Sequence, residues 1–238
     1  MTKEGLARLR NKMGRNHLKR NVANKRWVLL RKEYKFVLRP NAGKHSIRDS
    51  VPLGYFLKYL GFANTTREAK KLLLLTDVLI DGRKVKDVKC PVGFMDSIVV
   101  GQKAFRCLFG NKGRIIFIEV NDSDKKICKV LNKVKVKGGK TQLNLSDGRN
   151  ILSEDDVKVG DSLLLELPSQ KIVKRLQFKE GASIVLIGGK YGGVVGKLTK
   201  ILDDHIFFKD EEGAEFSTLK DYAFVVGGEN PELKIKIK

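Results

Sequence analysis

The sequence is short of cysteine, histidine and long apolar runs. Its three cysteines, Cys90, Cys107 and Cys128, stand far apart and form neither a CxxC pair nor a Cys/His cluster. This spacing predicts no metal site and fits a reducing cytoplasm, where lone cysteines most often serve as small buried residues. No apolar run approaches the ~20 residues that span a bilayer, and the basic N-terminus lacks the apolar core of a secretory signal. We therefore expect a cytoplasmic chain without a membrane partner.

Acidic residues are scarce relative to basic ones. The 238 residues include 48 Lys and Arg against 27 Asp and Glu, which gives a net charge of +21. More than half of this excess, +12, lies in residues 1–50, whereas residues 201–238 carry a net charge of −4. A balance this basic indicates a polyanionic partner. The basic run is long, rich in Arg and mixed with Asn, His and Trp, so we expect nucleic acid there, and solvent or a basic protein neighbour at the acidic end.

Residues 1–48 form a basic N-terminal extension with little hydrophobic periodicity before Trp27. Such a segment cannot bury enough surface to order by itself, so we expect it to fold against its partner. Trp27 could stack on a base or anchor the extension to the folded body. His17 and His45 could touch phosphate or sugar, or could be ordinary surface residues. Because Arg grips phosphates and stacks on bases, the candidate RNA-binding residues here are Arg8, Arg10, Lys12, Arg15, His17, Lys19, Arg20, Lys25, Arg26, Trp27, Arg39, Lys44, His45 and Arg48.

Residues 49–103 predict a small α+β unit. Apolar residues spaced i, i+3, i+4, i+7 from Leu53 to Leu60 predict a short helix that ends at Gly61. Thr65 and Glu68 have the spacing of a capping box that opens a second helix. That helix would pack inward with one face and present three cations on the other: Arg67, Lys70 and Lys71. The dipeptide at residues 81–82, Asp-Gly, then predicts a tight hairpin.

Residues 104–176 predict a β-rich domain, because short β-branched and Leu runs alternate with Gly, Asn and Asp. Lysines cluster between Lys125 and Lys137, and the alternation in KVKVK predicts lysines on one strand face and valines on the other. Two interpretations of the lysine face stay open, a solvated sheet face and a contact with the RNA backbone.

The stretch GGKYGGVVGK, residues 188–197, has the composition of a phosphate-binding loop but not its spacing. A Walker loop needs G-x-x-x-x-G-K-[ST], whereas Leu198 follows Lys197 and Tyr191 stands in place of the first glycine. The Rossmann pattern G-x-G-x-x-G is also missing, and no βαβ unit surrounds the stretch. We interpret it as a connection between two strands, in which Lys190 and Lys197 are candidate RNA contacts beside a purely structural alternative.

These motifs resemble known families. The run L-x-x-F-L-x-x-L-G-x-A-x-x-x-x-E-A-K-x-L, followed by L-I-D-G-x-x-V, resembles the S-four-type RNA-binding domain. That resemblance implies RNA contacts by the cationic helix face and by Arg83 and Lys84 beside the hairpin turn. The flanking segments NHLKRNVANKRW, RPNAGKHSIRDSVPL and CPVGFMDSIVV are similar to those of the S-four-e family of small-subunit ribosomal proteins. Residues 180–202 resemble the KOW motif of small SH3-like barrels.

The resemblance implies a mostly β, α+β protein in four parts: a basic extension (1–48), an S-four-type RNA-binding domain (49–103), a central β domain (104–176) and an SH3-like KOW barrel with an acidic end (177–238). The implied partners are small-subunit rRNA and neighbouring ribosomal proteins, with no cofactor and no small-molecule substrate. Two other functions fit the sequence less well. An RNA-modifying enzyme would need a further catalytic domain, and no aspartate-centred, Ser/His/Asp or metal constellation is evident. A transcription elongation factor would need neither the basic extension nor the S-four-type module.

Overall fold

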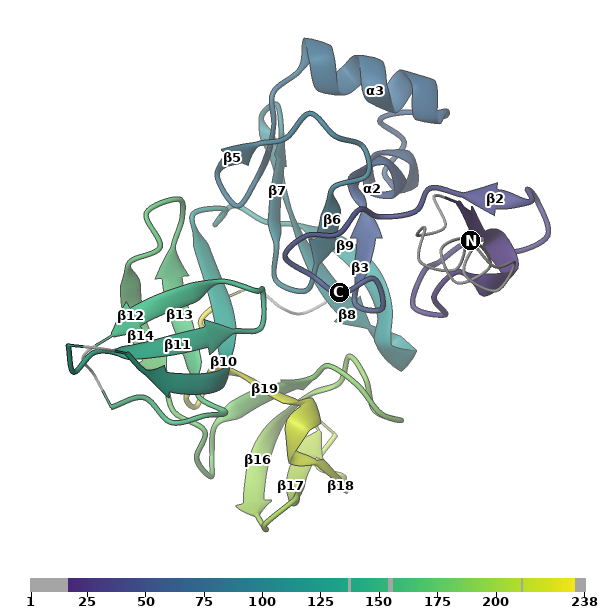
Figure 1. The fold of residues 1–238 in the computed structure, drawn as a ribbon. Coiled ribbons are helices and arrows are strands. Elements are labelled where there is room, and N and C mark those ends of the chain that lie inside the picture. The colour runs from purple at the N-terminus through teal and green to yellow at the C-terminus, as the bar shows by residue number, and fades with distance from the viewer. Residues whose placement is uncertain (1–16, 137, 154–155, 211, 234–238) are drawn as a thin grey trace, which may run out of the picture.

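The computed structural model describes residues 17–136, 138–153, 156–210 and 212–233. The candidate residues Arg8, Arg10, Lys12 and Arg15 lie outside them. The described chain is mostly strand and contains three five-stranded sheets, which Figure 1 shows as separate blocks packed around one another. This architecture confirms the predicted mostly β, α+β class. No described helix is long and apolar enough to cross a membrane.

Residues 17–48 of the basic extension lie folded against the body, contrary to the expectation that RNA alone would order them. They contain the ribbon of β1 (Leu18–Lys19) and β2 (Phe36–Val37). Ala23 and Trp27 belong to the same hydrophobic core as the first sheet. The apolar residues of the extension are few and irregularly spaced, so no periodic pattern revealed that they pack on the folded body. They are nevertheless enough to dock the extension there.

The two predicted helices are confirmed as α2 (Leu53–Tyr59) and α3 (Thr66–Leu75). Pro52 precedes α2 as its N-cap, and it ends β3 (Ser50–Pro52), which forms a small ribbon with β6 (Pro91–Gly93). The helices pack on an antiparallel sheet of order β5-β4-β7-β8-β9. Its strands are β4 (Val78–Ile80), β5 (Arg83–Lys84), β7 (Ser97–Val100), β8 (Lys103–Gly110) and β9 (Arg114–Glu119).

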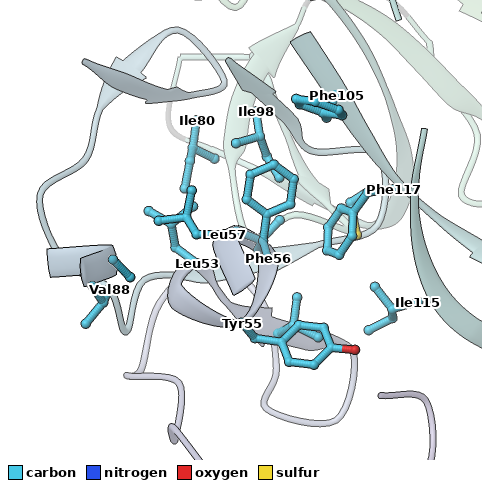
Figure 2. Close-up of a cluster of buried hydrophobic side chains, with 14 of the residues drawn as sticks. Leu53, Tyr55, Phe56, Leu57, Ile80, Val88, Ile98, Phe105, Ile115 and Phe117 are labelled. Carbon is cyan, nitrogen blue, oxygen red and sulfur yellow. The ribbon is translucent and has the colours of Figure 1, made fainter. Parts of the chain in front are cut away.

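This first sheet crosses the domain boundary that the sequence suggested at residues 103–104. Strand β8 pairs with β7 from Ser97↔Arg106 to Val100↔Lys103, and β9 continues the sheet. Aromatic residues of β8 and β9 complete the core beneath α2: the ring of Phe56 lies 5.6 Å from that of Phe105 and 4.7 Å from that of Phe117, both edge to face (Figure 2). The predicted boundary therefore cuts through a continuous sheet and core.

The second sheet confirms the β-rich region and has the order β12-β11-β10-β13-β14. Its strands are β10 (Lys125–Lys135), β11 (Thr141–Leu145), β12 (Asn150–Ser153), β13 (Ser162–Glu166) and β14 (Ile172–Leu176). The far half of β10 extends beyond the core, so that Val134 is as exposed as its lysine neighbours. The alternation in KVKVK thus places the two residue types on opposite faces, but neither face is buried.

The third sheet has the order β18-β17-β16-β15-β19 and contains β15 (Ser183–Leu186), β16 (Val195–Ile201), β17 (His205–Asp210), β18 (Glu215–Leu219) and β19 (Ala223–Gly227). The glycine-rich stretch connects β15 to its antiparallel neighbour β16, as predicted. Edge strands β18 and β19 do not pair in the described chain and are joined by the 3-10 turn Lys220–Tyr222. The sheet is a half-barrel; the KOW motif itself stays a prediction.

Candidate nucleic-acid interface

Helix α3 lies on the outside of the first domain, away from the other two sheets (Figure 1). Thr65 caps it by accepting a hydrogen bond from the Glu68 N–H at 3.2 Å, and the Glu68 carboxylate accepts one from the Asn64 N–H at 2.9 Å. This confirms the capping box. Hydrogen bonds to the carboxylate, chiefly from the Asn64 N–H and then from the Thr65 hydroxyl, lower the pKa of Glu68. Ala69 and Leu73 are buried on the inner face. The register of the helix is therefore fixed at both its start and its buried stripe.

The outer face of α3 carries exposed cations. The side chains of Arg67, Lys70 and Lys71 are all exposed, and none forms an ion pair among the described residues. Leu74 and Leu75 follow them and are exposed as well. Because none of the three is held in an ion pair within the described chain, they are available to an external anion.

The predicted hairpin lies near this helix. Asp81 and Gly82 both have positive φ, 50° and 74°, as a two-residue hairpin turn requires. Arg83 and Lys84, which follow the turn, are exposed. Lys84 forms an ion pair with Asp77 at the C-terminal end of α3, whereas Arg83 forms none among the described residues. Arg83 thus extends the cationic surface, and Lys84 is partly neutralised.

The basic extension divides into exposed and structural residues. Lys19, Lys25, Arg48 and His17 are exposed and Arg39 is half-buried. Arg20 pairs with Glu33 at 2.9 Å. Arg26 pairs with Asp49 at 2.8 Å, donates to the Ile187 carbonyl at 2.9 Å, and lies 4.5 Å above the ring of Phe109. These contacts tie the extension to the first and third sheets. The main role of Arg26 is therefore structural.

Trp27 is an anchor in this structure. Only 3% of it is exposed, its indole N–H donates to the Ser50 carbonyl at 3.0 Å, and its ring lies 5.6 Å from that of Tyr55. Tyr55 in turn donates its hydroxyl proton to the Val28 carbonyl at 2.8 Å. Of the two interpretations of Trp27, the geometry favours the anchor, because the buried ring has no free face for a base.

Lys126 lies at the centre of a buried ionic cluster that sequence reasoning missed. Its ammonium group is 2.6 Å from Asp96, 2.9 Å from Asp81 and 3.0 Å from Asp147, and all four side chains are almost completely buried. Asp81 and Asp96 lie in turns beside strands of the first sheet, Lys126 lies on β10 of the second sheet, and Asp147 lies in the turn between β11 and β12. The cluster therefore joins two sheets by charge. The only sequence signal was that the hairpin turn holds an aspartate beside apolar strands, which does not reveal its partners.

Two candidate RNA-binding residues of the extension belong to the same cluster. The Lys44 ammonium lies 2.6 Å from Asp81 and 3.1 Å from Asp96, and Nε2 of His45 lies 2.9 Å from Asp96. Arg149 adds a further cation, 2.7 Å from Asp81. Lys44 and His45 are therefore engaged with carboxylates inside the protein. Both candidates are better explained as structural residues that hold the extension on the two sheets.

The cluster is stabilised by its charges. Burial alone would raise the pKa of Asp96, but the charges of Lys126 and Lys44 outweigh it and hold this pKa well below its usual value. Burial would lower the pKa of Lys126, but Asp96 and Asp81 raise it well above its usual value. Burial likewise opposes ionisation of Asp147, whose pKa Lys126 and Arg149 nevertheless lower. Asp96, Lys126 and Asp147 are thus held in their charged forms by one another and by the neighbouring cations.

The lysine block at the start of the second sheet is less available to RNA than its sequence suggests. Lys126 is buried in the ionic cluster, and Lys129 donates to the carbonyls of Asp221 and Ala223 at 2.9 and 2.8 Å. Burial lowers the pKa of Lys129. Both residues fall in the half of β10 that pairs with β13, where Lys126 meets the carboxylates of the ionic cluster and Lys129 meets carbonyls just before and at the start of β19. Lys133 and Lys135 remain exposed.

The glycine-rich connection packs closely on the β8–β9 hairpin. Gly192 accepts a hydrogen bond from the Gly113 N–H at 2.9 Å, and a Cβ on Gly193, whose φ is +91°, would lie 2.0 Å from the Gly110 carbonyl oxygen. The glycines are therefore needed for close backbone approach. Lys190 and Lys197 are both exposed. The two lysines are accessible, but the loop backbone between them packs against the β8–β9 hairpin and is not open to a ligand.

Three family models match parts of this chain. The S4 domain model matches residues 51–98, the RS4NT (NUC023) domain model residues 12–48, and the model of Ribosomal family S4e residues 102–172. A cationic helix on an S4 domain, with a basic extension and two further sheets, defines an RNA-binding protein. "Small ribosomal subunit protein eS4" of Methanosphaera stadtmanae is 42% identical over 236 residues, which cover 94% of this chain and 98% of the relative.

The same protein of Methanocaldococcus jannaschii is 41% identical over 238 residues, with 93% and 98% covered. The crystal structure of the 30S ribosomal protein S4e from Thermoplasma acidophilum is similar with a TM-score of 0.67 and 30% identity, and the match covers 76% of this chain and 96% of that one. The chain belongs to ribosomal protein family S4e.

Proposed function

We propose that this protein is a structural constituent of the small ribosomal subunit in the cytoplasm, where it binds and stabilises rRNA without catalysing a reaction. The observation that carries the proposal is a division among its cations. Lys44, Lys126 and Arg149 are neutralised inside the protein, whereas Arg67, Lys70 and Lys71 share one exposed face and form no ion pair among the described residues. The second group is the one that an external polyanion would neutralise.

The binding energy would come mainly from phosphate contacts. Each Lys or Arg that neutralises a phosphate releases a condensed counterion, which favours binding most at low salt. Folded RNA would be read by shape, because its narrow major groove hides the base edges. The rigid docking of α3 on the first sheet fixes the spacing of its three cations, as recognition of a particular RNA shape requires.

We propose that the rRNA contacts extend from α3 to Arg83 and to the exposed residues of the extension, Lys19, Lys25 and Arg48. Lys190 and Lys197 are further candidates on the third sheet. Neighbouring ribosomal proteins are the proposed partners of the acidic C-terminal end, since acidic residues repel phosphates and attract basic proteins.

The proposed domain division follows the sheets. A first domain would run from the extension through β9, a second would hold β10 to β14, and a third would hold β15 to β19. The boundary between the first two would lie near residues 120–124, because β8 and β9 are hydrogen-bonded to β7.

The test replaces Arg67, Lys70 and Lys71 by Gln and measures the affinity of the full chain for small-subunit rRNA at several salt concentrations. Three lost phosphate contacts should weaken binding and reduce the slope of log K against log salt by about 2 to 3. The matched control removes the same charge elsewhere: Lys179, Lys200 and Lys209, also exposed, are replaced by Gln. If both triple variants lose the same slope, α3 has no special part in binding and the proposed interface is wrong.

A further inference from the structure

The outward face of the β1–β2 ribbon bears an exposed aromatic ring. Leu18 pairs with Val37, and both side chains pack against the core of the first sheet. Lys19 pairs with Phe36, so strand alternation directs this second pair away from the core. Phe36 is accordingly 50% exposed. The inner pair, Leu18 and Val37, holds this short ribbon on the core. Packing of the ribbon therefore does not explain a phenylalanine on its outer face.

Charged and aromatic groups surround this ring. The His17 ring meets it edge to face, with centroids 5.5 Å apart, and the Lys35 ammonium lies 5.6 Å from its centroid. Tyr34, two residues before it, is 66% exposed and lies 5.5 Å from the guanidinium of Arg20. Residues 17–39 include eight Lys and Arg but a single acidic residue, Glu33. Two exposed rings in so basic a surface match the chemistry of a single-stranded nucleic acid, whose bases stack while its phosphates need cations.

We propose that Phe36 and Tyr34 form a platform on which unpaired rRNA bases stack. This inference rests on the proposed rRNA-binding function and adds a contact to the bases. The sequence suggested Trp27 as a residue on which a base could stack, but its ring is buried. The rings of Tyr34 and Phe36 are accessible instead. A base on Phe36 would place its phosphate near Lys19 and Lys35. Charge favours RNA over an apolar protein surface as the occupant: Arg20 and Arg26 pair with carboxylates, and the other six cations of residues 17–39 would be costly to desolvate against an apolar partner.

The test uses the full chain and two RNA probes, a 12-nucleotide oligouridylate and a 12-base-pair RNA duplex, with affinity measured by fluorescence anisotropy. Uridines stack weakly on one another, so few internal stacks compete with the protein. Tyr34 and Phe36 are replaced together by Leu, which keeps apolar area but removes the aromatic face. We expect binding of the oligouridylate to weaken about 5- to 150-fold for each stacked base that is lost. Binding of the duplex should change less than twofold.

A second variant, Y34F with F36Y, keeps both rings and should bind the oligouridylate like the wild type. Because the rings are largely exposed, neither variant should fail to fold. If the leucine variant binds the oligouridylate as tightly as the wild type, the platform is refuted and the face is an apolar contact for a protein. If the wild type binds neither probe, the proposed RNA-binding function itself fails, so the two failures are distinguishable.

Discussion

Replacing Lys126 by Met should be among the most damaging single changes to the stability of this protein. The substitution keeps the length of an unbranched side chain but leaves Asp81, Asp96 and Asp147 around an uncharged group. These carboxylates lie 2.6–3.0 Å from the ammonium in the wild type and are almost completely buried. Removing one partner of a buried ion pair costs about 3–5 kcal/mol. Lys44 and Arg149 remain as partial compensation, so we expect a loss near the lower end, about 3 kcal/mol.

Urea denaturation at neutral pH measures this loss, and Lys133→Met on the same strand is the matched control. Lys133 is exposed, and its ion-pair partner among the described residues is exposed Asp156 at 3.3 Å, so its replacement should cost less than about 1 kcal/mol. A loss from Lys126→Met no larger than that from Lys133→Met would refute the argument that the cluster joins the sheets.

The pH dependence of unfolding provides a second test of the role of Lys126. Because the pKa values of Asp96 and Asp147 are lowered in the folded protein, the stability that they contribute is present above their unfolded pKa of about 4 and is lost as pH falls through the folded values. Protonation removes the partners of Lys126 in the wild type, and it relieves the uncompensated carboxylates in the variant. The difference in unfolding free energy between the two should therefore shrink in acid; a constant difference from pH 7 to pH 3 would contradict this account.

Two further predictions concern the anchor and the glycine-rich loop. Trp27→Ala should lower the free energy of unfolding by about 3–5 kcal/mol, because it empties a buried site and leaves the Ser50 carbonyl without its donor; urea denaturation checks this, and an effect below 1 kcal/mol would mean that the extension is not docked. Gly193→Ala should cost at least about 1 kcal/mol more than Gly101→Ala in the same assay. Both glycines have positive φ, but only a Cβ on Gly193 meets backbone, the Gly110 carbonyl, whereas one on Gly101 meets nothing within 4 Å. Equal costs would show that the close packing of the loop is unimportant.

Local patterns of this sequence predicted local structure well. The helical spacing after Leu53, the capping box at Thr65 and the Asp-Gly turn at residue 81 each depend on neighbours within a few residues, and each is confirmed. The strand connection at residues 188–197 was predictable for the same reason, since a missing hydroxyl after Lys197 argued against a Walker loop without any knowledge of the fold.

Long-range pairing was beyond those patterns. Lys126 meets carboxylates 45 and 30 residues earlier in the chain, and nothing in a run of lysines shows which one is buried. The same limit explains why the sequence counted Lys44 and His45 as RNA contacts, and why it placed a domain boundary at residues 103–104, inside β8. A cation is read from the sequence as a charge, but its partner is set by the tertiary fold.

The central claim, that this protein is a firmly bound component of the small ribosomal subunit, is tested most directly by sedimentation. Native cell extract is run through sucrose gradients at low and at high salt, and the protein is followed by blotting. The account predicts that the protein migrates with the small subunit and that this migration survives high salt, because a folded protein with many phosphate contacts is integrated into the rRNA. Recovery at the top of the gradient, or together with RNA polymerase, would contradict it.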